Sequence, residues 1–265
     1  MNLKNTSYFR TATVAVALII AAFIVMVIIG VVTHSPVDVL IESLLSEEIQ
    51  FAIRLSIITS VISTLLCILV AVPVAYALTR YSFPGKTVMN MLMDIPMALP
   101  PLVAGVGLLL FFGVSPVGKS LAAAGLAFVF TPLGIIMAQF FVNLPYMLRV
   151  TRSTFQGVNP RYEHVAKTLG CTDAQAFWRV TLPMSWNGLL AGSVITWSKG
   201  IGEFGAGLMV AGATRMKTET LPLSLYLNMS TGKLEFAIAA ATILIMISVI
   251  SLYAFERYGG ATHVY

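Results

Sequence analysis

Charged residues are scarce in this sequence. Aspartate, glutamate, lysine and arginine make up only 10% of the 265 residues, whereas hydrophobic residues make up 58%. A soluble domain carries about 25% charged residues. The shortage excludes a soluble globular domain, because too little polar surface would remain to cover so large a hydrophobic core.

Cysteine and histidine are also rare. The two cysteines, Cys67 and Cys171, stand in different segments, and the histidines at 34, 164 and 263 are scattered. No metal-ligand spacing and no disulfide framework can be built from them. We interpret the cysteines as packing residues, and the sequence lacks the residues of a metal-dependent membrane enzyme.

The apolar residues are clustered into long runs. Each run offers about the 20 residues that are needed to cross the hydrocarbon layer. They predict an all-α membrane protein, a single domain over residues 1–265, with six transmembrane helices at 11–32, 50–78, 87–113, 120–148, 188–211 and 236–255.

Basic residues in the loops predict the orientation. Ten of them fall on one side: Lys4, Arg10, Arg80, Lys86, Arg149, Arg152, Arg161, Lys167, Arg179 and Arg257. Only four fall on the other: Lys119, Arg215, Lys217 and Lys233. Because basic loops stay in the cytoplasm, we expect a multi-pass plasma-membrane protein with both termini and the loop 159–183 cytoplasmic. This bias explains the net charge of +5 without nucleic-acid binding.

One short segment matches the phosphate-binding loop pattern by chance. Residues 113–120 read Gly-Val-Ser-Pro-Val-Gly-Lys-Ser, which fits G-x-x-x-x-G-K-[ST]. That loop must follow a buried strand in a nucleotide-binding domain and needs a magnesium-binding acid downstream. This segment follows an apolar run, and no acid occurs between Lys119 and Glu163. It predicts a connection between membrane helices.

A polar island at 159–183 interrupts the apolar sequence. Good helix formers run from Glu163 to Leu169, Gly170 can end a helix in the left-handed conformation, and Thr172 can cap a second helix over 173–180. The island resembles the cytoplasmic coupling loop (EAA loop) of ABC-importer permeases. The alternative is an interfacial elbow without a partner. We expect an exposed knob of Leu169, Cys171, Ala174 and Phe177. The resemblance implies that contact with an ATPase is carried by Glu163, Ala166, Leu169, Gly170, Phe177, Val180, Leu182 and Pro183.

Three further stretches resemble one particular branch of the ABC-importer permeases. Residues 94–113, 138–149 and 202–207 look like the ModB-type family of molybdate and tungstate permeases, with sulfate and thiosulfate permeases as near relatives. The resemblance implies a permease that works as two copies with two cytoplasmic ATPases and an extracytoplasmic oxyanion-binding protein. ATP and magnesium would bind to the ATPases, and this chain would bind no cofactor and catalyse no reaction.

Several residues within the apolar runs are candidates for the translocation path. Lys199 and Glu203 are four residues apart, so one continuous helix would place them on one face. They are interpreted either as a polar gate beside the path or as an ion pair that fixes helix packing. Charged residues in a membrane are expensive and mostly functional. Pro100, Pro101 and Gly205 are further candidates, because the prolines remove backbone donors and glycine permits close approach.

A gradient-driven secondary transporter is the main rival class. It would show internal repeats and acidic residues in the middle of the membrane. The sequence has neither, and the coupling-loop pattern favours an ATP-driven importer.

Overall fold

The computed structural model describes residues 3–258, and the side chains of residues 8–253. Every regular element in this part is helical, so the predicted all-α fold is confirmed. The side chains of Lys4 and Arg257, and all of His263, lie outside the described residues. The helices are α1 (Leu3–Thr33), α2 (Val37–Leu45), α3 (Glu47–Arg80), α4 (Lys86–Ala98), α5 (Pro101–Gly113), α6 (Pro116–Ala123), α7 (Pro132–Gly157), α8 (Pro160–Thr168), α9 (Asp173–Ala176), the π-helix η1 (Phe177–Thr181), α10 (Leu182–Ile201), α11 (Gly205–Ala211), α12 (Leu221–Ser230) and α13 (Leu234–Tyr258).

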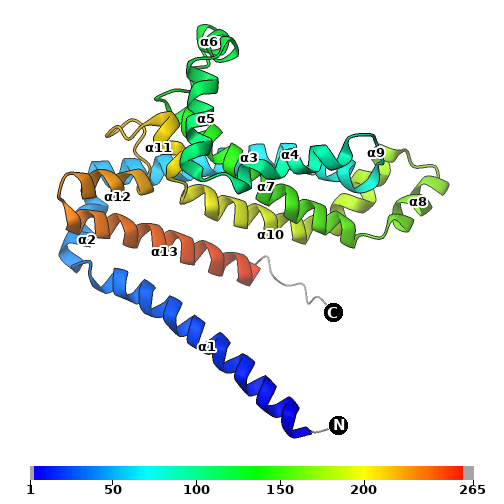
Figure 1. The fold of residues 1–265 in the computed structure, drawn as a ribbon, viewed down its shortest axis with the longest axis horizontal. Helices are drawn as coiled ribbons and strands as arrows, with labels where there is room; N and C mark the ends of the chain where they lie inside the picture. The colour runs from blue at the N-terminus through cyan, green and yellow to red at the C-terminus, as the bar shows by residue number, and fades with distance from the viewer. Residues whose placement is uncertain (1–2, 259–265) are drawn as a thin grey trace.

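The long helices α3, α7 and α10 form the centre of the bundle (Figure 1). Small residues let them approach closely. A Cβ atom added to Gly192 of α10 would lie 2.9 Å from the Val150 side chain of α7, and one at Gly188 would lie 2.4 Å from Thr154. Small residues at helix contacts are the usual means of packing in membranes. The resulting core includes Cys67, Ala71, Ala75, Met147, Leu148, Phe155 and Leu189.

Two parts of the chain stand away from this centre. In Figure 1, α1 diverges from the bundle, and its apolar stretch from Tyr8 is not buried by the chain. Helices α5 and α6 project from one side of the bundle. Figure 1 also places α8 and α9 at one end of the bundle, and α2 and α12 at the other.

The predicted spans are recovered in part. Four helical stretches are long and apolar enough to cross a membrane: Tyr8–Thr33, Glu47–Arg80, Pro132–Gly157 and Leu234–Tyr253. A fifth would be the pair α4 and α5, which meet at a bend of 111°. The count of six stays a prediction.

Three predicted spans were wrong as continuous helices. The segment 87–113 bends at Leu99 and Pro100, where the prolines remove backbone donors. The segment 120–148 is divided, because α6 ends at Ala123 and α7 begins only at Pro132. The segment 188–211 breaks between α10 and α11 at residues 202–204. In a membrane such breaks are tolerated only where protein or water satisfies the freed backbone groups.

The phosphate-loop pattern has a packing explanation. Helix α5, not a strand, precedes it, and Ser115 caps α6 by accepting a hydrogen bond from the Gly118 N–H at 3.1 Å. A Cβ atom at Gly118 would lie 2.2 Å from the Phe112 carbonyl oxygen. Glycine at 118 is therefore required by the turn between α5 and α6.

Candidate functional site

The polar island folds into a helix–glycine–helix elbow, a name we use for residues 159–183. Helix α8 ends at Thr168, and Gly170 follows with φ +91°. Its N–H donates to the Lys167 carbonyl at 3.0 Å, which is the turn that left-handed glycine permits at the end of a helix. Thr172 then caps α9 in a reciprocal capping box with Gln175. The predicted glycine turn and threonine cap are both confirmed.

A π-helical turn connects the elbow to α10. Residues 177–181 form this turn, and the Leu182 N–H donates to the Phe177 carbonyl, five residues back. Pro183 lies in the first turn of α10 and has no N–H to continue a regular ladder. The elbow therefore runs into α10 without an intervening loop.

Glu163 lies inside the elbow, not on its surface. Its side chain is 4% exposed and pairs with Arg80 at the end of α3, at 2.7 Å from Oε1 to Nε. The Thr181 hydroxyl donates to Oε1 at 2.6 Å, and the Tyr76 hydroxyl donates to Oε2 at 2.9 Å. Arg80 also donates to the Val158 carbonyl at 2.9 Å. This cluster ties α8 to α3 and to the start of α10.

The electrostatics of Glu163 follow from these contacts. Burial raises the pKa of the carboxyl, but hydrogen bonds from Thr181, Arg80 and Tyr76 and the charge of Arg80 together outweigh it. The pKa therefore lies below its usual range, and the group is ionised at neutral pH.

An aromatic cluster covers the ion pair. The ring of Phe177 lies 4.8 Å from that of Tyr76 and 6.2 Å from that of Phe155, both in edge-to-face geometry. Phe177 is thus half-buried, as Cys171 is, and its ring packs on α3 and α7 instead of standing free in the knob. The spacing alone did not reveal that the second helix turns this ring back onto α3.

The exposed surface of the elbow is made by other residues. Leu169 is 82% exposed, as expected, and Ala174 is exposed while Cys171 is half-exposed. Tyr162, Val165 and Trp178, which the sequence analysis missed, are more than half exposed. Of the remaining predicted residues, Ala166, Val180 and Leu182 are half-buried and Pro183 is exposed.

An apolar groove of about 830 Å³ separates part of the elbow from the helices beside it. Val72 and Pro73 of α3 line one side, and Trp178, Trp186 and Leu189 line the other. Because this space is open, the Glu163 cluster and the Phe177 ring carry much of the attachment between the elbow and α3.

The candidate path residues fall into two groups. Pro101 and Gly205 meet, because a Cβ atom added to Gly205 would lie 3.0 Å from the Cβ of Pro101. The bend at Pro100 therefore packs against the break between α10 and α11. This close approach explains glycine at 205.

Lys199 and Glu203 do not share a helix face, because α10 ends at Ile201. The ammonium of Lys199 lies 4.3 Å above the ring of Tyr146, while Glu203 accepts a hydrogen bond from the Ala206 N–H at 2.9 Å. Among the side chains of residues 8–253, the ion pairs do not join these two residues. No direct ion pair therefore joins them among the described side chains, although the two charges are close enough to attract each other.

Comparison with known proteins identifies a family for this chain. Residues 68–258 match the family described as "binding-protein-dependent transport system inner membrane component". The chain belongs to this family. It is therefore a member of an inner membrane transport family, and its relatives are named as permease proteins of transport systems.

The permease is similar to sulfate and molybdenum permeases to almost the same degree. It is 36% identical over 182 residues to the sulfate transport permease CysT of Salmonella typhimurium, covering 68% of this chain and 66% of the relative, just under two thirds of its length. It is 37% identical over 180 residues to the molybdenum transport permease ModB of Mycobacterium tuberculosis, covering 67% of each chain.

Solved structures share the fold at low sequence identity. A chain of a bacterial alginate ABC transporter, in complex with an alginate-bound periplasmic protein, superposes with a TM-score of 0.76 at 18% identity, covering 99% of this chain and 98% of that one. A chain of the MetNI methionine ABC transporter gives a TM-score of 0.61 at 16% identity, covering 83% and 100%.

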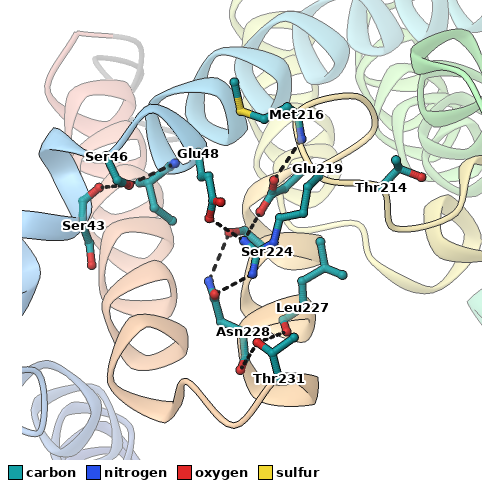
Figure 2. Close-up of polar contacts among 12 residues, drawn as sticks. Ser43, Ser46, Glu48, Thr214, Met216, Glu219, Ser224, Leu227, Asn228 and Thr231 are labelled. Carbon is teal, nitrogen blue, oxygen red and sulfur yellow. Dashed lines mark hydrogen bonds and ion pairs between the residues drawn. The ribbon is translucent and has the colours of Figure 1, made fainter.

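A second polar cluster lies at the other end of the permease. Figure 2 shows Glu48, Glu219 and Asn228 turned toward one another. The Arg215 guanidinium joins them, at 2.8 Å from an oxygen of each. The other oxygen of Glu219, which is fully buried, accepts from the N–H of Met216 at 3.2 Å, where φ is +54°.

This cluster ties the loop between α11 and α12 to the start of α3. Sequence analysis used Arg215 only as a charge in the orientation count and did not find its partners. Glu219 is only four residues away, but Glu48 lies 167 residues away along the chain, so local spacing does not indicate the whole cluster.

The ion pair of Glu163 yields a first prediction. Glu163→Gln leaves Arg80 buried without its counter-charge, which costs about 3 kcal/mol. We expect backbone amides of residues 160–181 to exchange with deuterium roughly hundredfold faster in detergent. The control is Asp173→Asn, which removes the exposed ion pair with Lys167 in the same elbow and should change exchange little. Equal exchange in the two variants would contradict the assignment.

The same hydrogen-exchange measurement can be repeated as a function of pH. Because the folded-state pKa of Glu163 is lowered, its stabilisation is fully present above the unfolded value of about 4.3 and is lost as pH falls through the folded value. Elbow protection in the wild type should persist down to about pH 5 and decline at lower pH. In Glu163→Gln this dependence should disappear.

Proposed function

We propose that this permease is the membrane subunit of an ATP-driven importer for molybdate or tungstate. It would form the translocation path as two copies and receive force from cytoplasmic ATPases through the elbow. ATP and magnesium would bind to the ATPases, and an extracytoplasmic binding protein would deliver the anion. The similarity to ModB supports the substrate, and the fold shared with the alginate transporter, whose structure includes a periplasmic protein, supports the assembly.

The buried Glu163 cluster is the observation that carries this proposal. Leu169 stands exposed at the turn. Glu163 of the same elbow is fastened to α3 by Arg80 and bonds to Thr181, the residue just before α10. A push on the exposed turn would therefore move both helices together. An interfacial elbow without a partner would need no buried ion pair to a transmembrane helix.

The second candidate is a sulfate or thiosulfate permease. The near-equal identities to CysT and ModB support it equally well. The anions are tetrahedral in both classes and differ mainly in size. A gradient-driven transporter is not supported, because the family depends on binding proteins.

Coupling is tested at Gly170. Proline cannot adopt φ +91°, and the turn has open space around it, so Gly170→Pro changes the turn without a steric clash elsewhere. We expect Gly170→Pro and Glu163→Ala to reach the membrane but to hydrolyse ATP without anion uptake in proteoliposomes. Gly157→Ala is the control, since Gly157 also has open surroundings and lacks a positive φ. Full transport by both elbow variants would refute the coupling role.

Orientation is tested with single cysteines. In a background with Cys67 and Cys171 replaced by serine, Asp173→Cys should react with an impermeant maleimide only from the cytoplasmic side. Glu42→Cys should react only from outside, because the basic loops stay inside. Both positions are exposed. The reverse pattern would overturn the orientation.

Substrate is tested by ATPase stimulation. We expect the isolated permease to show no appreciable molybdate affinity, because a path that must release its anion binds it weakly. The complete complex should hydrolyse ATP faster when molybdate-loaded binding protein is added. If only sulfate-loaded binding protein stimulates it, the sulfate assignment holds instead.

A further inference from the structure

Three helices bring one line of polar side chains to an exposed face. Asp94 belongs to α4, Tyr146 and Arg149 to α7, and Lys199 to α10. The Arg149 guanidinium donates two hydrogen bonds to the Asp94 carboxylate, at 3.2 Å from Nε to Oδ1 and at 3.1 Å from Nη2 to Oδ2. Tyr146 and Arg149 are three residues apart on α7, hence neighbours on one face. We call these four residues the polar strip.

Lipid is an unsuitable environment for the polar strip. Tyr146 lies near the middle of α7, which is itself a candidate span, and the ammonium of Lys199 lies over its ring. Side chains of Arg149 and Asp94 are 56% and 34% exposed, and Lys199 is exposed. Helix α7 continues to Gly157, so Arg149, which the sequence analysis placed in a cytoplasmic loop, lies within this helix. Exposed charges on a membrane helix are costly unless they face water or protein. The strip therefore lines an aqueous path or a contact with a second copy.

Lys199 differs from the other charged members of the strip. Arg149 and Asp94 form a direct ion pair, whereas no carboxylate lies within ion-pairing distance of Lys199 among the side chains of residues 8–253. Glu203 attracts the Lys199 ammonium only from farther away. Glu203 is the nearby acid in sequence, and it is engaged by the Ala206 N–H in the first turn of α11. The Lys199 ammonium lies over the face of the Tyr146 ring. That face attracts the positive charge and leaves the N–H donors of the ammonium available.

The backbone beside Lys199 is held in place by buried polar contacts. The side-chain amide of Gln139, on α7, donates to the Gly200 carbonyl at 2.9 Å and lies 3.3 Å from the Thr59 hydroxyl of α3. Asn143 is buried next to Gly200, where an added Cβ atom would lie 3.3 Å from its amide nitrogen. The end of α10 is thus fixed to α3 and α7, so the position of Lys199 is set by the fold.

We propose that the polar strip is a transit site for a small oxyanion with two negative charges. Lys199 makes the first contact, and Arg149 offers its planar fork when the anion displaces the carboxylate of Asp94. This inference rests on the proposed importer function. It adds to that function the residues that the anion meets within the membrane.

The residues of the polar strip suit weak, transient binding of an anion better than tight binding. Lysine presents a strongly hydrated point charge on a flexible chain, so it attracts an anion without enclosing it. Asp94 already occupies the fork of Arg149 and competes with any anion for it. A site that must both admit and release its ion needs such moderate attraction. In an assembly of two copies, two Lys199 side chains would match the two charges of molybdate or sulfate.

Transport by reconstituted complexes tests the site. The permease, its ATPase and its binding protein are placed in proteoliposomes, and uptake of radiolabelled molybdate and of sulfate is measured beside ATP hydrolysis. Lys199→Met should lower uptake of the transported anion about tenfold or more, because a hydrogen bond to a charged group is lost. ATP hydrolysis stimulated by loaded binding protein should stay within about twofold, because the elbow is intact. Lys199→Arg should retain most uptake.

A matched control is available in the same chain. Lys233 lies 5.9 Å from the ring of Phe236, outside the strip, and Lys233→Met should leave uptake unchanged. Uptake by Lys199→Met at the wild-type rate would overturn the proposal, as would equal losses in Lys199→Met and Lys199→Arg. If Lys199→Met does not reach the membrane, Lys199→Gln takes its place in the same comparison. Failure of the wild-type complex to import either anion would instead refute the importer function itself.

Discussion

The buried ion pair between Glu163 and Arg80 is the contact on which the elbow depends. It joins side chains 83 positions apart and satisfies the carboxylate with three donors. A carboxylate buried without partners would be far more costly than the hydrogen bonds it makes. Glu163 can therefore be buried only when α3, α8 and the start of α10 are arranged as they are here. A single charged group thus joins all three elements, in addition to the apolar core that packs α3 against α10.

Broken helices impose a second constraint on the bundle. The bend between α4 and α5 packs against the break between α10 and α11, and Pro101 meets Gly205 there. Each break frees backbone groups that lipid cannot satisfy. Bringing the two breaks together places both against protein, so the irregular backbone gathers in one part of the molecule. The polar strip, on α4, α7 and α10, includes two of the helices that end at these breaks.

Sequence reasoning recovered the features that depend on neighbouring residues. The turn at Gly170 and the cap at Thr172 follow from local conformational preference, and the structure has both. Hydropathy located the long helices α1, α3 and α13. Pro100 and Pro101 indicated that backbone donors are lost near the bend at 99–100. The break at 202–204 was missed, because composition reports how apolar a segment is and not where it bends. The error at Lys199 and Glu203 came directly from assuming one helix through Gly202.

Partners distant in sequence could not be predicted. Arg80, Arg149 and Arg215 all entered the sequence analysis as charges that orient loops. In the structure each has a carboxylate partner on another element, Glu163, Asp94 and Glu48 respectively. A count of basic residues cannot distinguish a charge that faces water from one that holds two helices together. Only the folded chain reveals that these arginines join separate elements.

The use of arginine and lysine in this chain follows from their chemistry. Arginine forms these three ion pairs, and its planar group makes several directed hydrogen bonds at once. Lys199, by contrast, rests on an aromatic ring and, among the described side chains, pairs with no carboxylate. A point charge with free donors contributes little to holding helices together. Placing the Lys199 charge in a membrane helix is costly. A transported anion is a partner that this positive charge fits and that accounts for the cost.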